Sequence, residues 1–520
     1  MHAGSGTSLE DVVYGLRSSY MRLPGPLREI SGGMYRRLPE VVRFGPAYTQ
    51  QARFIAASES WPEDDLREYQ WTRLKATLQY AARRVPWYMR TWAEWGVSPA
   101  DIQAPQDLAR LPLTSKADLR AHLDEFVSLD ARPRDRLATM TSGSLGSPTR
   151  LYYTRGLTRS VERAFIRDMW RRAGYRDGAP IASVRASYVP GHQRGRMWDR
   201  EPTWNRWLYS SVDMSAENCG RIVGHMEKVQ PQFIHAMVSP LTSLAAFVVS
   251  SGRRPRLPRL RGVFVGMETS RPWQVELWRR AFGASLSVIR WYGMGEHVAL
   301  AGSCAESLDY HVFPQYSFVE LLPGPDGAAA VARAGERGLM TDAADRDRAE
   351  CGVRRASPGL RRVVGTSFDN WVMPLIRYDT EDHARPKPGR CACGRPYGLL
   401  EDVAGRSNAW AVTSAGEWVP FAQIEAGAVN DAMRRVLRFQ FVQECPGALH
   451  LFLVPAPGAS REDLLRVVGK FTARLGSRFT LTWEQVPEIP PLPSGKHSYF
   501  VQTLPLPPWL VEAPRSAREG

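Results

Sequence analysis

Short apolar runs alternate with amphipathic segments through the middle of the chain. The runs that predict strands lie at residues 181–184, 233–236, 262–266 and 287–292, and helical spacing covers 159–173 and 271–281. This alternation is typical of an α/β fold built on a substantial sheet. A further helical pattern runs from Tyr69 to Pro86, and Ser115 is placed to cap another helix.

The pattern changes after Gly405. Apolar stretches at 437–443, 448–454 and 479–486 predict strands, and a helical stripe lies between the last two, at Leu464, Val468, Phe471 and Leu475. We therefore expect two domains. The larger, 1–404, has mixed sheets and helices, and the smaller, 405–520, is a mobile α+β domain.

Two stretches fit neither pattern. Residues 1–65 are mixed and show no clear core signal. Residues 334–362 are rich in Arg, Asp, Ala and Gly and poor in large apolar residues, which predicts a surface insertion.

Composition and charge exclude several classes. The 520 residues are 43% hydrophobic and 23% charged, which excludes a disordered or fibrous chain. The net charge of +15 is spread over scattered arginines, so we expect no nucleic-acid partner. No apolar run is long enough for a membrane helix and no export signal is visible, so we expect no membrane partner. Six cysteines do not make a disulfide scaffold, which favours a cytoplasmic location.

Residues 141–149, Thr-Ser-Gly-Ser-Leu-Gly-Ser-Pro-Thr, form the sharpest local motif. Such a loop presents backbone N–H groups and hydroxyls to an oligophosphate, although it lacks the Lys of a P-loop. Four further segments add chemistry. They are Trp-Tyr-Gly-Met-Gly-Glu at 291–296, Arg-Tyr-Asp-Thr-Glu-Asp at 377–382, Gly-Arg-Ser-Asn at 405–408 and Ser-Gly-Lys at 494–496.

These five segments, in this order, resemble the signatures of the adenylate-forming superfamily of acyl-CoA synthetases and adenylation domains. The phenylacetate–CoA ligase-like branch is the most similar, with its capsule-biosynthesis and deazaflavin-cofactor adenylating homologues. The pointers are Leu-Thr-Ser-Lys-Ala-Asp-Leu at 113–119 and Val-Met-Pro-Leu-Ile-Arg-Tyr at 372–378. The resemblance covers about Tyr69 to Phe500.

The resemblance implies a role for each matching residue. The phosphate loop corresponds to Ser142, Gly143, Ser144 and Gly146, and the turn against adenine to Gly266, Met267 and Glu268. Tyr292, followed by Gly293, would stack on adenine, and Glu296 would hold Mg²⁺. Asp382 would bind the ribose hydroxyls, Arg406 would contact ribose or phosphate, and Lys496 would close over the reacting centre.

The chain departs from the family pattern at several positions. Leu145, Ser147, Gly295, Glu381 and Asn408 replace the residues usual there. Asn408 stands at the hinge between the expected domains. These departures keep open the alternative of a non-catalytic nucleotide-binding homologue.

A second set of residues has metal-ligand character. Cys304, His311, Cys391 and Cys393 form a Cys₃His set, a combination that tetrahedral zinc favours, although the spacing is not that of a standard finger. Unpaired cysteines in a reducing compartment are the alternative. Members of the ligase branch carry Cys-x6-His and Cys-x-Cys-Gly-Arg at these places, so the resemblance implies a structural zinc that pins the ends of the 334–362 insertion.

The acid-binding pocket is less defined. The stretch 188–209 holds Trp198, Trp204 and Trp207, which would enclose a planar acid or pack in the core, and Arg194 or Arg196 would meet an anionic group. His235 fits a core histidine, and His297 is a candidate to point into the site.

The sequence thus predicts an ATP-dependent ligase that makes an acyl-adenylate and passes it to a nucleophile, with CoA thiol as the leading acceptor. An amine or a carrier-protein thiol is the alternative acceptor. The sequence does not identify the acid; we expect a small carboxylic acid, and an aromatic one is an alternative. A homodimer is also an open alternative.

Overall fold

A computed structural model gives the fold of the chain. It describes residues 8–140, 149–185, 189, 195–211, 214–270, 272–323, 360–406, 410–416, 418–420, 435–456, 458–490, 498–502 and 504. Within these ranges no helix is both long and apolar enough to cross a membrane.

A twelve-stranded sheet forms the body, in the order β11-β12-β13-β14-β10-β9-β8-β7-β6-β3-β5-β4. Its parallel part consists of β3 (Ile181–Val184), β5 (Arg206–Tyr209), β6 (Phe233–Ala236), β7 (Gly262–Val265) and β8 (Ser287–Gly293). Strand β4 (Trp198–Glu201) closes one edge in antiparallel pairing. The four strands predicted from the apolar runs are therefore confirmed.

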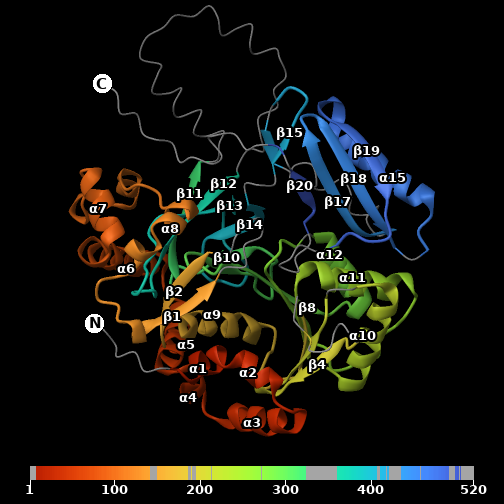
Figure 1. Ribbon diagram of the computed structural model, residues 1–520, viewed down its shortest axis with the longest axis horizontal. Helices are drawn as coiled ribbons and strands as arrows, with labels where there is room; N and C mark the ends of the chain where they lie inside the picture. The colour runs from red at the N-terminus through yellow and green to blue at the C-terminus, as the bar shows by residue number, and fades with distance from the viewer. Residues whose placement is uncertain are drawn as a thin grey trace, which may run out of the picture.

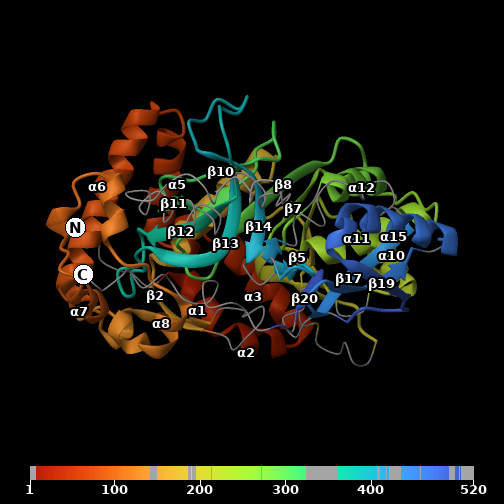
Figure 2. The same ribbon diagram turned by 90° about the horizontal axis from the view of Figure 1, so that it is seen from above.

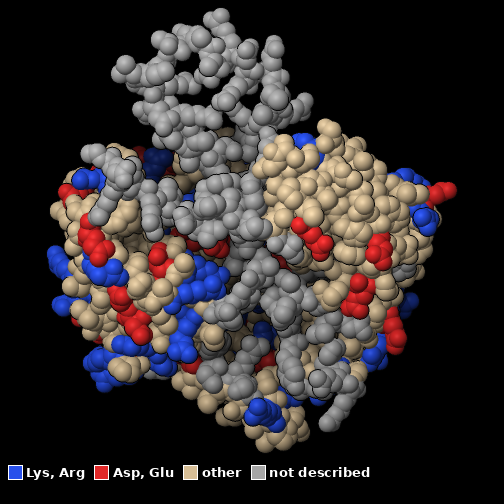
Figure 3. Space-filling model, turned by 45° about the horizontal axis from the view of Figure 1, so that its top comes forward, with Lys and Arg blue, Asp and Glu red and all other residues tan. Residues whose placement is uncertain are grey.

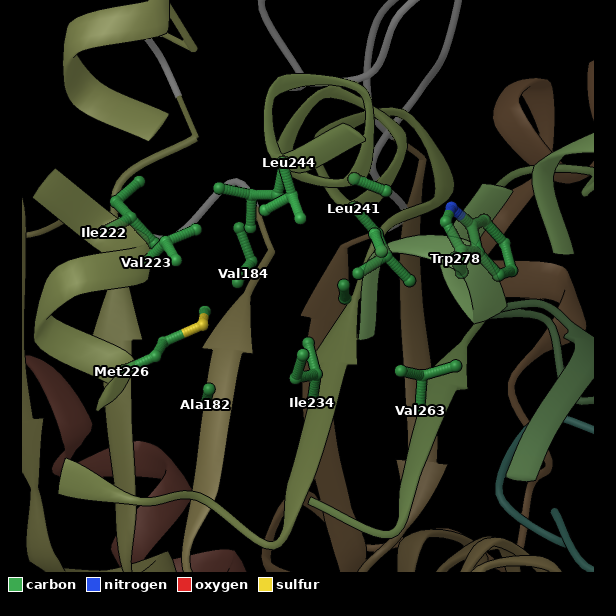
Figure 4. Packing of buried hydrophobic residues seen from close by; sticks show 14 of the residues in the cluster. Ala182, Val184, Ile222, Val223, Met226, Ile234, Leu241, Leu244, Val263 and Trp278 are labelled. Carbon is green, nitrogen blue, oxygen red and sulfur yellow. The ribbon is translucent and has the colours of Figure 1, made fainter. Parts of the chain in front are cut away.

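Helices cover both faces of the parallel strands because each strand is apolar on both sides. On one face, α10 (Ala216–Val229), α11 (Val238–Ser250) and α12 (Pro272–Phe282) pack on Ala182, Ile234 and Val263 (Figure 4). On the other, α9 (Thr158–Arg172) packs on Phe233 and Phe264. The predicted helices at 159–173 and 271–281 correspond to α9 and α12.

The second half of the sheet is antiparallel. It consists of β9 (Leu300–Gly302), β10 (Tyr310–Val312), β11 (Ser317–Pro323), β12 (Arg361–Ser367), β13 (Tyr378–Lys387) and β14 (Leu399–Arg406). A separate hairpin pairs β1 (Arg136–Met140) with β2 (Arg150–Thr154). Beside these strands pack α6 (Glu63–Arg84), α7 (Pro86–Glu94) and α8 (Lys116–Ala121).

The C-terminal strands form a separate sheet, in the order β19-β18-β17-β20. Their bounds are β17 (Val436–Cys445), β18 (Ala448–Pro455), β19 (Thr480–Gln485) and β20 (Phe500–Gln502), and β15 (Trp410–Val412) pairs with β16 (Trp418–Pro420) nearby. Helix α15 (Arg461–Leu475) buries Leu464, Phe471 and Leu475 against this sheet, as the sequence predicted. Figures 1 and 2 show this unit beside α11 and α12, where the Gln274 side chain donates to the Tyr499 hydroxyl over 3.4 Å.

The N-terminal stretch differs from its weak sequence pattern. It forms α1 (Leu9–Gly15), α2 (Arg17–Arg22), α3 (Gly25–Arg37), α4 (Glu40–Phe44) and α5 (Pro46–Ser58), which lie at the bottom of Figure 1. Ion pairs and a short apolar face both fix these helices. Arg28 pairs with Asp199 over 2.8 Å and Glu10 with Arg163 over 2.5 Å, while Phe44, Tyr48 and Ile55 are buried against α9. Hydrophobic periodicity does not register the ion pairs.

The surface charge is dispersed. Lys and Arg are interspersed with Asp and Glu on the face shown in Figure 3. Many arginines are also engaged in ion pairs, including the buried Arg167 with Asp177. This arrangement agrees with the scattered-arginine interpretation of the +15 charge.

Candidate active site and metal centre

The candidate nucleotide site lies at the carboxyl ends of the parallel strands, the edge where open α/β sheets bind their ligands. The turn after β7 begins at Gly266, and the motif residue Tyr292 lies near the end of β8. Because β7 and β8 are neighbours in the sheet, these two motifs are brought side by side.

Gly266 is required by close packing. A Cβ placed on Gly266 would lie 2.6 Å from the indole of Trp291 on β8. Met267 follows in the left-handed region, with φ of 71°, and its sulfur lies 2.7 Å from a guanidinium nitrogen of Arg185. Glu268 comes next and is half-buried, so the turn presents one carboxylate beside the strand ends.

Tyr292 and Asp382 interact directly although they are distant in sequence. The Tyr292 hydroxyl donates to Oδ2 of Asp382 over 2.8 Å. Burial, followed by the charge of Asp382, raises the pKa of Tyr292 well above its ordinary value, so this phenol stays protonated. The predicted stacking ring and the predicted ribose acid therefore form one connected pair.

Glu296 lies in the turn after β8 and is 4% exposed. One of its oxygens accepts a hydrogen bond from the Tyr378 hydroxyl over 3.2 Å. Tyr378 begins β13, so two of the sequence motifs meet at this carboxylate. A buried carboxylate with a remaining oxygen is a suitable ligand for Mg²⁺.

A cleft brings Glu296, Tyr378 and Asp382 together and adds one residue that the sequence motifs do not include. It is lined by Lys116, Met294, Glu296, Tyr378, Thr380, Glu381 and Asp382. Lys116 starts α8, directly after its N-cap Ser115, whose side chain accepts from the Asp118 amide. The segment 113–119, which in the sequence only marks the family resemblance, also places the Lys116 ammonium in this cleft.

Backbone bonds explain why Lys116 reaches the cleft. The Thr114 amide donates to the Arg377 carbonyl over 3.0 Å, and the Asp379 amide donates to the Thr114 carbonyl over 2.9 Å. The chain before α8 is thereby attached alongside the start of β13. Arg377 has a supporting role, since its guanidinium pairs with Glu320 over 2.9 Å.

Two residues of the matching motifs, one of them the departure at Glu381, lie on strained backbone. Glu381, with φ of 62°, and Met267 both adopt a conformation that glycine accepts without cost. A residue with a side chain holds this conformation at a cost of roughly 1–2 kcal/mol.

The four predicted metal ligands come together. The ligand atoms of Cys304, His311, Cys391 and Cys393 all lie within 4.8 Å of one another. The Cys304 and Cys391 sulfurs are 3.6 Å apart, and the Cys393 sulfur is 3.3 Å from Nε2 of His311. Thiolates at about 2.3 Å from a tetrahedral zinc are about 3.8 Å apart, so the spacing fits zinc.

The surroundings of His311 also fit a ligand. Its Nδ1 lies 3.2 Å from the Asp309 carbonyl, which orients Nε2 toward the cysteines. The expectation that this set pins the ends of the 334–362 insertion stays a prediction, because residues 324–359 lie outside the described residues. Pro323 and Arg361, on either side of them, pair across β11 and β12.

Comparison with known proteins gives related matches over both parts of the chain. Residues 414–503 match the CapK C-terminal domain family. A phenylacetate–coenzyme A ligase from Pseudomonas putida is 27% identical over 360 residues, which cover 66% of this chain and 71% of the relative. The enzyme of the same name from Thermus thermophilus is 26% identical over 363 residues, 67% of this chain and 72% of its own.

The fold has a counterpart among solved structures. A 2-hydroxyisobutyryl-CoA ligase, crystallised in the postadenylation state with R3-HIB-AMP, aligns with a TM-score of 0.63 at 18% identity, over 85% of this chain and 90% of that one. The chain is thus similar in sequence to phenylacetate–coenzyme A ligases, and it shares the fold of a solved CoA ligase.

Several residues that this branch would use fall outside the described ranges. They are the loop residues Ser142, Gly143, Ser144 and Gly146, and Lys496. For Arg406 only the backbone is described: it ends β14 and pairs with Asp382 on β13. The arginine is thus in register with the predicted ribose acid.

The predicted acid-binding aromatics divide between two places. Trp198 stacks on His225 with ring centres 4.1 Å apart and lies at the carboxyl edge of the sheet, opposite Tyr209. Trp204 instead packs under the N-terminal helices, stacked on Phe44 at 5.7 Å. Trp204 is therefore core, and Trp207 packs with His225 at the edge of the core.

The charged and histidine candidates are also placed. Arg194 lies outside the described residues, and Arg196 pairs with Asp199 over 2.6 Å. His235 is buried and lies 3.0 Å from Arg185, and burial followed by Arg185 lowers its pKa well below the usual value. His297 is buried with Tyr153 and Tyr316, and its Nε2 lies 3.5 Å from Glu162.

Proposed function

We propose that this ligase activates a small carboxylic acid with ATP, forming an acyl-adenylate and releasing pyrophosphate, and then transfers the acyl group to the thiol of CoA. The observation that carries the proposal is the cleft that gathers Lys116, Glu296 and Asp382. It combines a cation, a metal-binding carboxylate and a diol-binding carboxylate at the carboxyl edge of the sheet.

The nucleotide would be bound by the residues around this edge. The Tyr292 ring would stack on adenine beside the Gly266–Glu268 turn, and Asp382 would accept from the ribose hydroxyls. The 2.8 Å bond from Tyr292 holds the Asp382 carboxylate in place before the ribose arrives. Arg406 would add a positive charge near the same sugar or its phosphate.

The phosphates would meet the cations of the site. Glu296 would hold Mg²⁺, which when bound neutralises phosphate charge. Lys116 offers a further positive charge, which matters here because Ser147 stands where a lysine is usual in the phosphate loop. Lys496 would complete the site when the C-terminal unit closes, stabilising the charge that develops as the acid oxygen attacks phosphorus.

CoA is the acceptor that relatives support best. The P. putida and T. thermophilus proteins are named phenylacetate–coenzyme A ligases. The acid here stays unassigned, since Arg196 is already paired with Asp199 and Trp204 belongs to the core.

The Cys₃His set would hold one structural zinc. Four protein ligands leave no open position, so the metal would not touch substrate. Its place between β9, β10 and the loop before β14 indicates a stabilising role for the antiparallel half of the sheet. The division into 1–404 and a closing domain of 405–520 belongs to the same proposal.

Pyrophosphate exchange over a panel of carboxylic acids, followed by mass spectrometry for a CoA thioester, tests the proposal. Lys496→Ala should abolish exchange while Lys470→Ala, an exposed lysine on α15, should leave it unchanged. Exchange without a thioester would replace CoA by another acceptor. ATP binding with no exchange for any acid would overturn the ligase assignment.

A further inference from the structure

An apolar surface lies on the N-terminal helices. Of the fifteen large apolar side chains that are exposed among the described residues, nine fall between positions 12 and 42. They are Val12, Leu16, Leu23, Leu27, Ile30, Met34, Leu38, Val41 and Val42, exposed by 37–64%. Such concentration on one short stretch marks an interaction surface, since scattered exposed apolar residues are the norm.

Helix α3 shows that this exposure is built into the fold. Arg28, Gly32 and Tyr35 share its buried face, and Leu27, Ile30 and Met34 share the face that is exposed. The usual amphipathic order is thus inverted, with an arginine inside and three aliphatic residues outside.

Strong contacts on the inner face prevent the helix from turning over. The two terminal guanidinium nitrogens of Arg28 donate hydrogen bonds to the two carboxylate oxygens of Asp199, over 2.8 and 3.1 Å. A Cβ on Gly32 would lie 2.6 Å from Pro202, which shows how closely α3 packs there. The aliphatic stripe is therefore held outward.

The charges beside the stripe are basic. Arg22 and Arg37 are exposed and have no ion-pair partner among the described residues, whereas the nearby carboxylates are engaged, Glu29 with Arg200 and Glu40 with Arg171. Aliphatic residues rimmed by arginines are the pattern of a helix that lies in the interface of an anionic bilayer. A second copy of the chain would instead bring like charges together across a twofold axis.

We propose that α2 and α3 seat the enzyme on an anionic lipid surface, with Leu27, Ile30 and Met34 entering the interface and Arg22 and Arg37 meeting the headgroups. The expected absence of a membrane partner rested on the lack of a spanning segment, which does not bear on a surface helix. The cleft with Lys116 lies on other elements, so attachment and adenylation are separable.

Co-flotation of the full-length protein with vesicles tests this membrane binding. The protein should float with phosphatidylcholine vesicles that contain phosphatidylglycerol, and much less of it should float with pure phosphatidylcholine vesicles. The triple variant Leu27→Ser, Ile30→Ser, Met34→Ser should lose at least about tenfold in partitioning. Arg22→Gln and Arg37→Gln should each lose about fivefold on anionic vesicles only.

Controls keep the result interpretable. Leu465→Ser removes an exposed aliphatic residue from α15 and should not change partitioning. Circular dichroism and thermal unfolding should show the triple variant folded, since its three positions are exposed. Failure of the wild type to float, equal loss with Leu465→Ser, or a dimer in light scattering that the triple variant dissociates would each overturn the proposal.

Discussion

The hydroxyl of Tyr292 lies 2.8 Å from Oδ2 of Asp382, which joins the end of β8 to β13. In the free enzyme this bond holds the carboxylate that we assign to the ribose. Tyr292→Phe should therefore raise the KM for ATP about tenfold, because a hydrogen bond to a charged group is worth about 1.5–3 kcal/mol. The kcat should change little.

Steady-state kinetics of pyrophosphate exchange measures this effect. Asp382→Asn should raise the KM for ATP at least as much, and the double variant should show less than the sum of the two changes in binding free energy. Tyr48→Phe, which removes a hydroxyl on α5 far from these motifs, is the matched control. Additive effects of Tyr292 and Asp382 would contradict their coupling.

Lys116 makes a second prediction for the same cleft. If its charge meets the phosphates, Lys116→Ala should lower kcat/KM for ATP by at least about tenfold, and Lys116→Arg should recover part of the loss. Lys470→Ala provides the control at an exposed lysine. An equal loss of kcat/KM in the arginine variant would indicate that the shape of the ammonium group matters as well as its charge. No loss in either variant would contradict the role of Lys116 in binding the phosphates.

The strained backbone at Glu381 and Met267 predicts a gain in stability. Glycine relieves the cost of a left-handed conformation, roughly 1–2 kcal/mol, but loses roughly 0.5–1 kcal/mol through the greater freedom of the unfolded chain. Glu381→Gly and Met267→Gly should each raise the free energy of unfolding in urea by up to about 1 kcal/mol. The alanine variants keep Cβ and should not, so a gain with alanine would assign the effect to the side chain.

Many of the strands and helices could be predicted from the sequence because the apolar residues of each element recur at a simple spacing. The apolar runs at 181–184 and 233–236 gave their strands, and the stripe ending at Leu475 gave α15, since burial on both faces or on one stripe leaves a clear pattern. The order of strands in the sheet does not leave such a pattern. Contacts such as β10 with β14 join residues about 90 apart and depend on packing.

The site was predicted in part for a related reason. Motif residues are recognisable one segment at a time, so Tyr292, Glu296 and Asp382 were named before their meeting was known. Lys116 was not, because only the tertiary bridge from Thr114 to Tyr378 brings it to the cleft. The pattern of the N-terminal helices is weak because buried ion pairs, such as Arg28 with Asp199, have no period and the apolar face of α4 and α5 is short.

Two histidines, the buried His383 and the half-buried His225, predict how stability depends on pH. Burial lowers the pKa of His383 and of His225 from 6.5 to about 4. The unfolded chain then binds more protons than the folded chain between those values, so stability is full above about pH 6.5 and falls as pH drops toward 4. The buried His383 contributes at most about 3 kcal/mol, and the half-buried His225 contributes less because solvent screens it.

Urea unfolding at several pH values measures this dependence. His383→Gln should flatten the fall between pH 6.5 and about 4, whatever its effect on stability at neutral pH. An unchanged slope for His383→Gln would show that the folded protein protonates this ring normally.

The Cys₃His set makes a prediction about metal content. Purified protein should contain about one zinc, bound to three sulfurs at about 2.3 Å and one nitrogen at about 2.0 Å in X-ray absorption. Removal by a chelator should lower Tm, because the binding free energy of a structural zinc is part of the folding free energy. Cys304→Ser should lose the metal, while Cys219→Ser, a buried thiol in another core, should keep it. Less than about half an equivalent of zinc, or equal loss in both variants, would contradict a site at these four residues, whose ligand atoms lie within 4.8 Å of one another.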